Sequence, residues 1–274
     1  MAITASDVNK LRQQTGAGMM DCKKALEESN GDFEKAVDFL RKKGQKVAAN
    51  RADRDAKEGL VIAKITTDGK RGAMVVVNCE TDFVAKNDDF GAFASTVCQI
   101  AIDKTPSSVE ELKAMPYNSE ISISDKFIEQ IGKIGEKIDL SYFQSISSEQ
   151  VVAYNHPGNK LACLVAFNKV VSEEVSKNVA MQVAAMAPVA IDKDDVDSST
   201  LERELEIARE QVRQEGKPEE MVEKISQGKL NKFYKESTLL NQEFIKDNKL
   251  TIRQYLQSID KDLTVTAFKR YSLS

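Results

Sequence analysis

The sequence has a single histidine, His156, and four cysteines that are scattered along 274 residues without a CxxC pair. A clustered histidine metal site is therefore excluded, and four free thiols in a reducing compartment are the simplest interpretation. Apolar runs are also short, and none approaches the ~20 residues that span a bilayer. Because the first residues, MAITASDVNK, contain neither an apolar secretory core nor an Arg-rich presequence, we expect a cytoplasmic protein.

Motifs for phosphate binding and catalysis are equally scarce. Neither GxxxxGK[ST] nor GxGxxG occurs, and GxSxG and HExxH are absent as well. The net charge of −4 argues against a nucleic-acid binder held by phosphate contacts. We therefore expect no cofactor, and a binding or regulatory protein rather than an enzyme. One alternative stays open, an enzyme that uses the thiol of Cys79.

The first part of the chain predicts three short helices. Thr4 to Asp7 resembles a capping box that starts the first helix, and TGAG ends it. The second is expected from about Met19 to Ser29. NGD then caps a third helix with apolar residues at helical spacing, which we expect to end at Gly44. The charged stretch 45–58 lacks apolar periodicity and is predicted to be a linker.

Two later segments repeat one pattern. GLVIAKITTDGKRGAMVVVN predicts strand, turn and strand, followed by an amphipathic helix, and VVAYNHPGNKLACLVAFN predicts the same order. A further strand, LSYFQSI, is expected between the two. We therefore predict an α+β fold with a duplicated core of two subdomains, each a small antiparallel sheet backed by helices.

The last part of the chain changes character. A highly charged helical pattern that is broken at EGKP predicts a protruding helical hairpin. TLLNQEFI is expected to be a strand or extended return, LTIRQYLQSI a helix and LTVTAFKRY a final strand. The predicted organisation is an N-terminal three-helix module with its linker at 1–54, core subdomains at 55–142 and 143–197, the hairpin at 198–230 and a C-terminal module at 231–274.

The two copies differ after their second strands. Only KVV separates Asn168 from the helix-capping Ser172, whereas eight residues separate Asn78 from Asn87. The connection can evidently be made without ETDFVAK, so that segment is an elaboration, and it carries Phe83. The residues alone leave two interpretations open: Phe83 folds back to plug the core, or the loop presents it to a partner.

Three segments together resemble the elongation factor Ts family, the nucleotide-exchange factors for elongation factor Tu in bacterial translation. They are LRQQTGAGMMDCKKALEESNGDFEKAVDFLRKKG, VNCETDFVAKNDDF and LLNQEFIKD, and the resemblance extends over essentially the whole chain. It implies a non-enzymatic protein with a ubiquitin-associated-like helical module, a two-subdomain core, a hairpin and a C-terminal module. The implied partner is elongation factor Tu, contacted at its GTPase domain and a second domain, without direct binding of nucleic acid or membrane.

The resemblance also implies which residues bind. Thr81, Asp82, Phe83 and Val84 match a segment that enters the partner's GTPase domain near its magnesium and phosphate site. Insertion of Phe83 would displace groups that hold the magnesium ion, and GDP would then leave faster. The other positions that match contact residues are Arg12, Met19, Met20, Ile134, Gly135 and His156.

Some features qualify this assignment. Two adjacent methionines after a Gly turn cannot both face inward, so at least one of Met19 and Met20 is expected to be exposed. The turn HPGN is stiffer than the family's His-Gly type, and the ending FKRYSLS lacks the family's Gly-Glu-rich tail. A rival hypothesis is an adaptor that binds ubiquitin-type or peptide partners through residues 1–54 alone.

Overall fold

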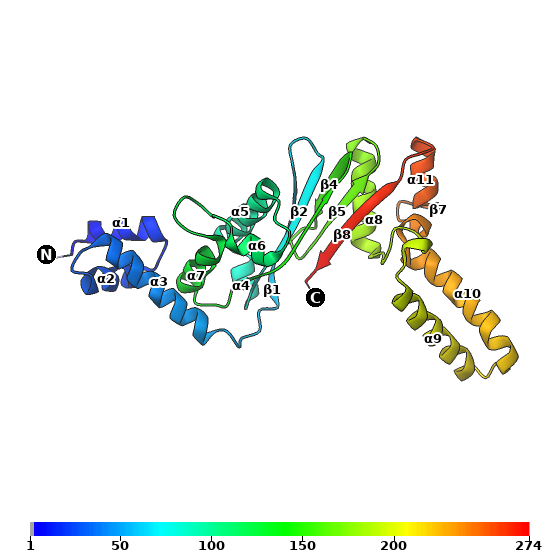
Figure 1. Cartoon of the computed structure of the whole chain (residues 1–274), viewed down its shortest axis with the longest axis horizontal. Helices are drawn as coiled ribbons and strands as arrows, with labels where there is room; N and C mark the ends of the chain where they lie inside the picture. The colour runs from blue at the N-terminus through cyan, green and yellow to red at the C-terminus, as the bar shows by residue number, and fades with distance from the viewer. Residues whose placement is uncertain (1–2, 274) are drawn as a thin grey trace.

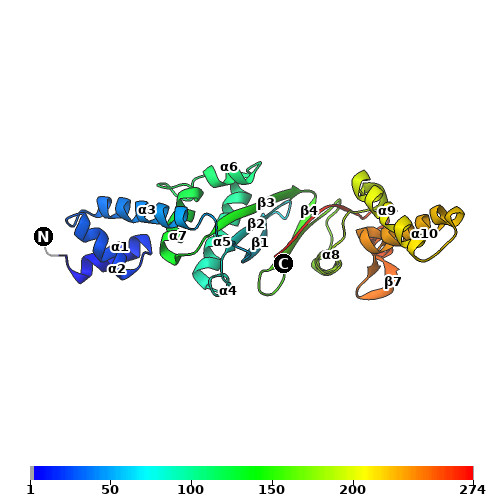
Figure 2. The same ribbon diagram turned by 90° about the horizontal axis from the view of Figure 1, so that it is seen from below.

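The computed structural model of the protein describes residues 3–273. The molecule is elongated, with a three-helix unit at one end, two sheets in the middle and a helical hairpin at the other end (Figure 1). Figure 2 shows the same order from below. Two small antiparallel sheets backed by helices confirm the predicted α+β fold class.

The N-terminal unit is built by local signals that the sequence displays. The predicted capping box is confirmed, because Asp7 N donates to Thr4 Oγ1 at 3.2 Å and Thr4 N donates to the Asp7 carboxylate at 3.0 Å. Gly16 ends the first helix with a left-handed φ of 70°. The helices are α1 (Ala5–Thr15), α2 (Met19–Glu28) and α3 (Phe33–Asn50).

The prediction that α3 ends at Gly44 is wrong, because the helix continues to Asn50. A Cβ atom on Gly44 would lie 2.8 Å from the carbonyl oxygen of Ile128, and one on Gly132 would lie 3.0 Å from the Gly44 Cα. Ile128 and Gly132 belong to α7 (Ile123–Ile134). Gly44 therefore permits a close crossing of two helices, and the first part of the predicted linker is helical.

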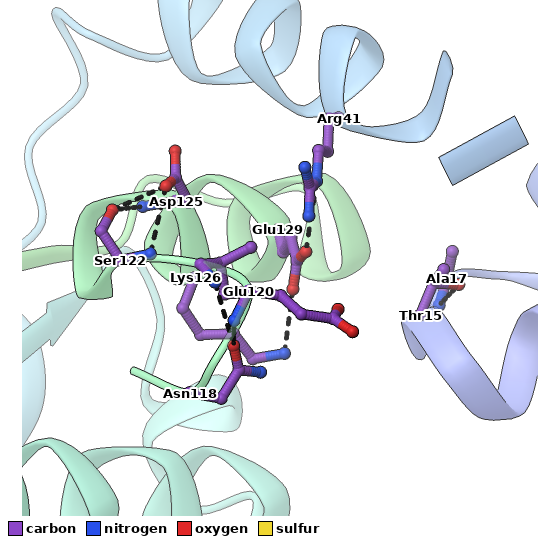
Figure 3. A network of polar contacts seen from close by, with 10 residues as sticks. Thr15, Ala17, Arg41, Asn118, Glu120, Ser122, Asp125, Lys126 and Glu129 are labelled. Carbon is purple, nitrogen blue, oxygen red and sulfur yellow. Dashed lines mark hydrogen bonds and ion pairs between the residues drawn. The ribbon is translucent and has the colours of Figure 1, made fainter. Parts of the chain in front are cut away.

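An ion pair accompanies this crossing. Figure 3 shows Arg41 of α3 directed at Glu129 of α7, with Nε and Oε1 3.9 Å apart. Lys126 also lies 2.9 Å from the Glu129 carboxylate. The pair of Arg41 with Glu129 and the glycine crossing dock the helical unit on the first subdomain, whereas the Lys126 contact lies within α7.

The first subdomain contains one three-stranded sheet with the order β1-β2-β3, all neighbours antiparallel. Helix α5 covers its outer face with Phe90 and Phe93, and both are buried in the main core together with residues of α7. The elements are β1 (Glu58–Ile65), β2 (Arg71–Cys79), α4 (Asp82–Ala85), α5 (Asp88–Lys104), α6 (Val109–Ala114), α7 and β3 (Asp139–Ser147).

The second subdomain repeats this plan with the order β4-β5-β8. Helix α8 covers its outer face, and Val179 and Val183 are buried against it. The third strand of this sheet, β8, follows the hairpin and the C-terminal segment in the sequence. The elements are β4 (Gln150–Asn155), β5 (Leu161–Phe167), α8 (Glu173–Met186) and β8 (Val265–Ser272).

The two sheets pack against each other, which explains why both central strands are apolar on both faces. Val61 and Val76 of the first sheet belong to one buried cluster with Leu164 of the second. The sheets approach so closely that a Cβ on Gly72 would lie 2.8 Å from Leu164 Cδ2. The order of layers is therefore helix, sheet, sheet, helix, and it brings the β4–β5 turn against β1, where Val61 N donates to Asn159 O at 2.7 Å.

The hairpin has a thin apolar seam, as expected, and ion pairs along its sides. Val212 and Val222 are buried in the seam, and Arg209 pairs with Glu223 at 2.9 Å. The second helix ends later than residue 230, and TLLNQEFI forms a 3-10 turn and a two-residue strand. The elements are η1 (Lys193–Asp195), α9 (Ser198–Gln214), α10 (Glu219–Ser237), η2 (Leu239–Asn241), β6 (Glu243–Phe244), β7 (Asp247–Thr251) and α11 (Ile252–Ile259).

Candidate functional site

Phe83 stands outside the protein's own core. Its side chain is 82% exposed. The interpretation of Phe83 as a core plug is therefore wrong. The segment that carries it is also not a plain loop, because Asp82–Ala85 forms the one-turn helix α4 with Thr81 as its N-cap. The exposed ring thus has a defined backbone beneath it.

The opposite side of α4 faces inward. Ala85 is buried, and Val84 packs against the main core from a half-buried position. These two side chains hold the turn down while the neighbouring Phe83 points away. Of the four predicted residues, Thr81 caps the helix, Val84 packs against the core and Phe83 is the exposed aromatic.

The fourth of these residues, Asp82, is paired within the turn. Lys86 Nζ lies 2.6 Å from its carboxylate. That hydrogen bond is the main reason the pKa of Asp82 is lowered, with a smaller contribution from the nearby charge of Lys160. Asp82 is therefore ionised at neutral pH and presents a negative charge beside Phe83.

Two carboxylates brace the junction between β2 and α4. Glu136 accepts hydrogen bonds from Glu80 N at 3.2 Å, Thr81 N at 3.1 Å and Thr81 Oγ1 at 2.7 Å. Glu80 in turn accepts from Lys137 N at 2.6 Å and from the Arg51 guanidinium at 3.1 and 2.9 Å. The pKa of Glu80 is lowered, chiefly by the Lys137 N–H and then by the charge of Arg51.

The structure brings two of the predicted contact segments together. A groove of about 330 Å³ lies beside Phe83, and Val84 and Ile134 also line it. Gly135 ends α7 with a left-handed φ of 80°, which turns the chain so that Glu136 follows directly at the groove. Ile134 and Gly135 are thus structural neighbours of the Phe83 turn.

The three predicted residues of the helical unit lie on its surface. Arg12 is exposed, and Met19 and Met20 are 55% and 74% exposed, so both methionines and not merely one face solvent. The side chain of Lys133 connects this unit to the groove. It lines the groove, pairs with Asp89 at 3.2 Å and lies 3.6 Å from where a Cβ of Gly16 would be.

His156 lies in the β4–β5 turn and is exposed. Its Nδ1 is 3.0 Å from the Tyr154 hydroxyl. Gly158 and Asn159 of the same turn line a second groove of about 550 Å³ together with Lys86. The turn that holds His156 therefore flanks α4 on another side from Ile134.

The structure gives no support to a catalytic Cys79. The thiol is buried, and it donates to Thr81 O at 3.1 Å. Burial raises its pKa to about 12, so it stays protonated at neutral pH and is a poor nucleophile. Within residues 3–273, no group of three or more His, Cys, Asp or Glu side chains could hold a metal ion, and no helix is long and apolar enough to cross a membrane.

Sequence reasoning missed the bracing residues. Glu80 and Glu136 are ordinary acidic residues in sequence, and 56 positions separate Glu136 from the backbone N–H of Glu80 that it binds. The one available signal was the position of Glu136 directly after Gly135, because a residue that follows a helix-ending glycine leaves the helix axis in a new direction.

Comparisons with known proteins identify the family of the chain. A sequence model of the family described as "Elongation factor TS" matches residues 80–274. Among curated relatives, "Elongation factor Ts" of Amoebophilus asiaticus is 53% identical over 98% of this chain and 98% of its own length. The proteins of the same name from Cytophaga hutchinsonii and Porphyromonas gingivalis are 53% and 50% identical over 99% and 100% of this chain and 99% of their own lengths. The chain therefore belongs to the elongation factor Ts family and is a translation elongation factor.

Proposed function

We propose that this protein is a non-enzymatic nucleotide-exchange factor that binds elongation factor Tu in the cytoplasm and promotes release of GDP. The observation that carries the proposal is the exposed ring of Phe83 on a braced helical turn. A large apolar side chain in this position is available for insertion into another protein and contributes nothing visible to its own core.

The energetics of such an insertion are favourable. Burying a phenylalanine ring contributes about 1.5–3 kcal/mol. Because Thr81, Val84 and Ala85 already fix the turn, little additional conformational entropy is lost on binding. An energy of about 2 kcal/mol corresponds to roughly a thirtyfold change in an equilibrium constant.

The proposed mechanism is differential binding. Insertion of Phe83 near the magnesium site would displace groups that hold the ion, and the phosphates of GDP would lose charge compensation. The half-exposed carboxylate of Asp82 would act in the same direction. Because coupling between two ligands is reciprocal, GDP and this protein must weaken each other's binding to the GTPase by the same factor.

The remaining exposed residues supply the rest of the interface in this proposal. Arg12, Met19 and Met20 would contact the GTPase from the helical unit, and His156 from the β4–β5 turn. Ile134 would contribute through the groove beside Phe83. The partner would then be held on both sides of the inserted ring.

The test is stopped-flow release of fluorescent GDP from elongation factor Tu, with full-length wild type, Phe83→Ala and Val170→Ala. Val170 is the matched control, since it is 78% exposed on the corresponding connection of the second subdomain. We expect Phe83→Ala to lose most of the stimulation, by a factor of about 30 from the burial energy above, and Val170→Ala to match wild type. Unchanged release with Phe83→Ala would refute the insertion mechanism.

A second measurement tests the reciprocity. The wild-type protein and the GTPase should co-purify as a stable complex without nucleotide, and addition of GDP with magnesium should dissociate it. A complex that is equally stable with and without GDP would contradict differential binding.

A further inference from the structure

The carboxylate of Glu136 accepts three hydrogen bonds from one short segment of the chain. Its three hydrogen-bond donors are Glu80 N, Thr81 N and Thr81 Oγ1, which are consecutive groups at the start of α4. Two of these donors are backbone N–H groups that precede the helix and have no role in its internal hydrogen bonds. The side chain thus fixes the backbone path into the turn that carries Phe83.

Thr81 links this carboxylate to the helix itself. Its hydroxyl donates to Glu136 at 2.7 Å and accepts from Val84 N at 3.4 Å as the N-cap. A hydroxyl that has its hydrogen directed at a carboxylate leaves its lone pairs free for the N–H of the helix. Glu136 therefore orients the cap, and the cap orients α4.

Helix α4 is too short to hold its own position. It has four residues, Asp82–Ala85, and an isolated helical turn is unstable in water. Its direction must come from contacts with the rest of the protein, which are the packing of Ala85 in the main core and the Glu136 carboxylate at the start of the helix. Loss of the carboxylate would leave two backbone N–H groups without this partner and the threonine free to change rotamer.

We propose that Glu136 is a positioning residue for nucleotide exchange, which acts by setting the direction in which α4 presents Phe83. This inference rests on the proposed function. It assigns Glu136 no contact with the partner: its effect passes through Phe83. The neighbouring clamp of Glu80 with Arg51 joins the end of α3 to the same junction, and its role is attachment of the helical unit.

A double-mutant cycle separates positioning from a merely structural role. The variants are Glu136→Ala, Phe83→Ala and the two combined, assayed by GDP release at saturating concentration and by thermal unfolding. We expect Glu136→Ala alone to lower the maximal release rate about tenfold, and to add less than about twofold in the Phe83→Ala background. Equal factors in both backgrounds would overturn the proposal, because Glu136 would then act independently of Phe83.

A matched control comes from the same subdomain. Glu111 accepts hydrogen bonds from Ser107 N at 2.7 Å and Ser107 Oγ at 2.5 Å at the start of α6, which is the same chemistry away from α4. Glu111→Ala should lower stability without lowering exchange. Glu136→Gln, which keeps one carbonyl acceptor, should retain more exchange than Glu136→Ala, and equal losses for the two would count against the hydrogen-bonding role.

The outcomes distinguish this inference from the proposed function. If the wild-type protein does not accelerate GDP release, the proposed function fails and the role of Glu136 in exchange fails with it. If the wild type accelerates release and Phe83→Ala does not, but Glu136→Ala equals the wild type, only the role of Glu136 is overturned. If Glu136→Ala unfolds, Glu136→Gln carries the same cycle.

Discussion

The two subdomains solve the same connection in different ways. Each has an asparagine at the end of its central strand: Asn78 is the second-last residue of β2, and Asn168 directly follows β5. Each asparagine side chain is hydrogen-bonded to a neighbouring segment, because Asn78 Nδ2 donates to Glu58 O at 3.2 Å and Asn168 Nδ2 donates to Asp262 O at 2.8 Å. After this shared point the second subdomain needs only KVV to reach α8. The first inserts a capped helical turn. Closure of the fold therefore does not require α4, and its presence calls for another explanation.

The braces of the two connections differ as well. In the second subdomain, the Gln150 amide binds the backbone of Val171 through both of its ends, at 2.6 and 3.3 Å. In the first, a carboxylate holds three donors and a second carboxylate holds an arginine. This neutral amide and an ion pair of Lys169 with Asp260 at 2.7 Å fix a short connection that presents a small valine. Charge-assisted hydrogen bonds are stronger, and the less exposed ones, those of Glu80 and Glu136, lie where a large aromatic ring must be held in solvent.

Exchanging the connections is the most severe test of this comparison. A chimera in which KVV replaces ETDFVAK should fold, because the second subdomain already joins the same elements in this way. It should lose exchange at least as completely as Phe83→Ala, and lose about 1–3 kcal/mol of stability with the burial of Val84 and Ala85. Circular dichroism and GDP release measure the two properties.

Either alternative result would break the comparison. A chimera that does not fold would show that α4 is required for the first subdomain itself. A chimera that folds and still releases GDP would show that α4 is not the exchange element.

The helical unit packs on the first subdomain where α3 crosses α7, and a substitution of Gly44 tests how tightly. In Gly44→Ala the new Cβ would meet the Ile128 carbonyl oxygen at 2.8 Å. Overpacking of this kind costs about 1–3 kcal/mol, which exceeds the gain of about 1 kcal/mol from replacing a helical glycine. We expect a net loss of stability of about 1 kcal/mol in urea unfolding, and faster proteolysis between α3 and β1.

The matched control lies in the hairpin beyond the second subdomain. Gly228 is in the middle of α10, and a Cβ there would meet nothing within 4 Å. Gly228→Ala should therefore stabilise the protein by up to about 1 kcal/mol. Shifts of the same sign for both variants would contradict the close crossing of α3 and α7.

Gly44 also shows why some features of the fold were predicted correctly from the sequence and the end of α3 was not. Caps such as Thr4 with Asp7, and the alternation of strands and turns, are local features, and they were predicted correctly. A glycine inside a helical pattern has two meanings, a stop or a close contact. The choice depends on Ile128, which lies 84 positions away in the chain.

The same distinction between local signals and long-range contacts applies to the candidate site. Phe83, the two methionines and Ile134 were predicted as contact residues from the resemblance, because whole segments carry it. Glu136 was not predicted, since the role proposed for it depends on a contact with Thr81 across 55 positions. The packing of the two sheets was missed for a related reason: an apolar strand such as AMVVVNC indicates burial on both faces and does not name the partner.

The smallest expected effect concerns acid, and it compares Glu80 with Asp260. Both carboxylates brace a connection, and the pKa of each is lowered: that of Glu80 chiefly by the Lys137 N–H, and that of Asp260 chiefly by the Lys169 ammonium group. A pKa that is lower in the folded than in the unfolded state means that the charged carboxylate stabilises the folded state. The resulting stability is present above the ordinary carboxyl range and is lost as pH falls through the lowered value.

Glu80→Gln should therefore be less stable than the wild type at neutral pH, and the gap should shrink as the pH of urea unfolding is lowered below about 4, where both side chains become neutral. Asp260→Asn should show a smaller gap, because the Asp260 side chain is 44% exposed and that of Glu80 only 15%. Salt should reduce the Asp260 gap more than the Glu80 gap, since exposed pairs are screened more strongly. A gap for Glu80→Gln that is the same at neutral and acid pH would mean that the carboxylate's charge contributes nothing to the brace, and the contrast between the two connections would then reduce to their length.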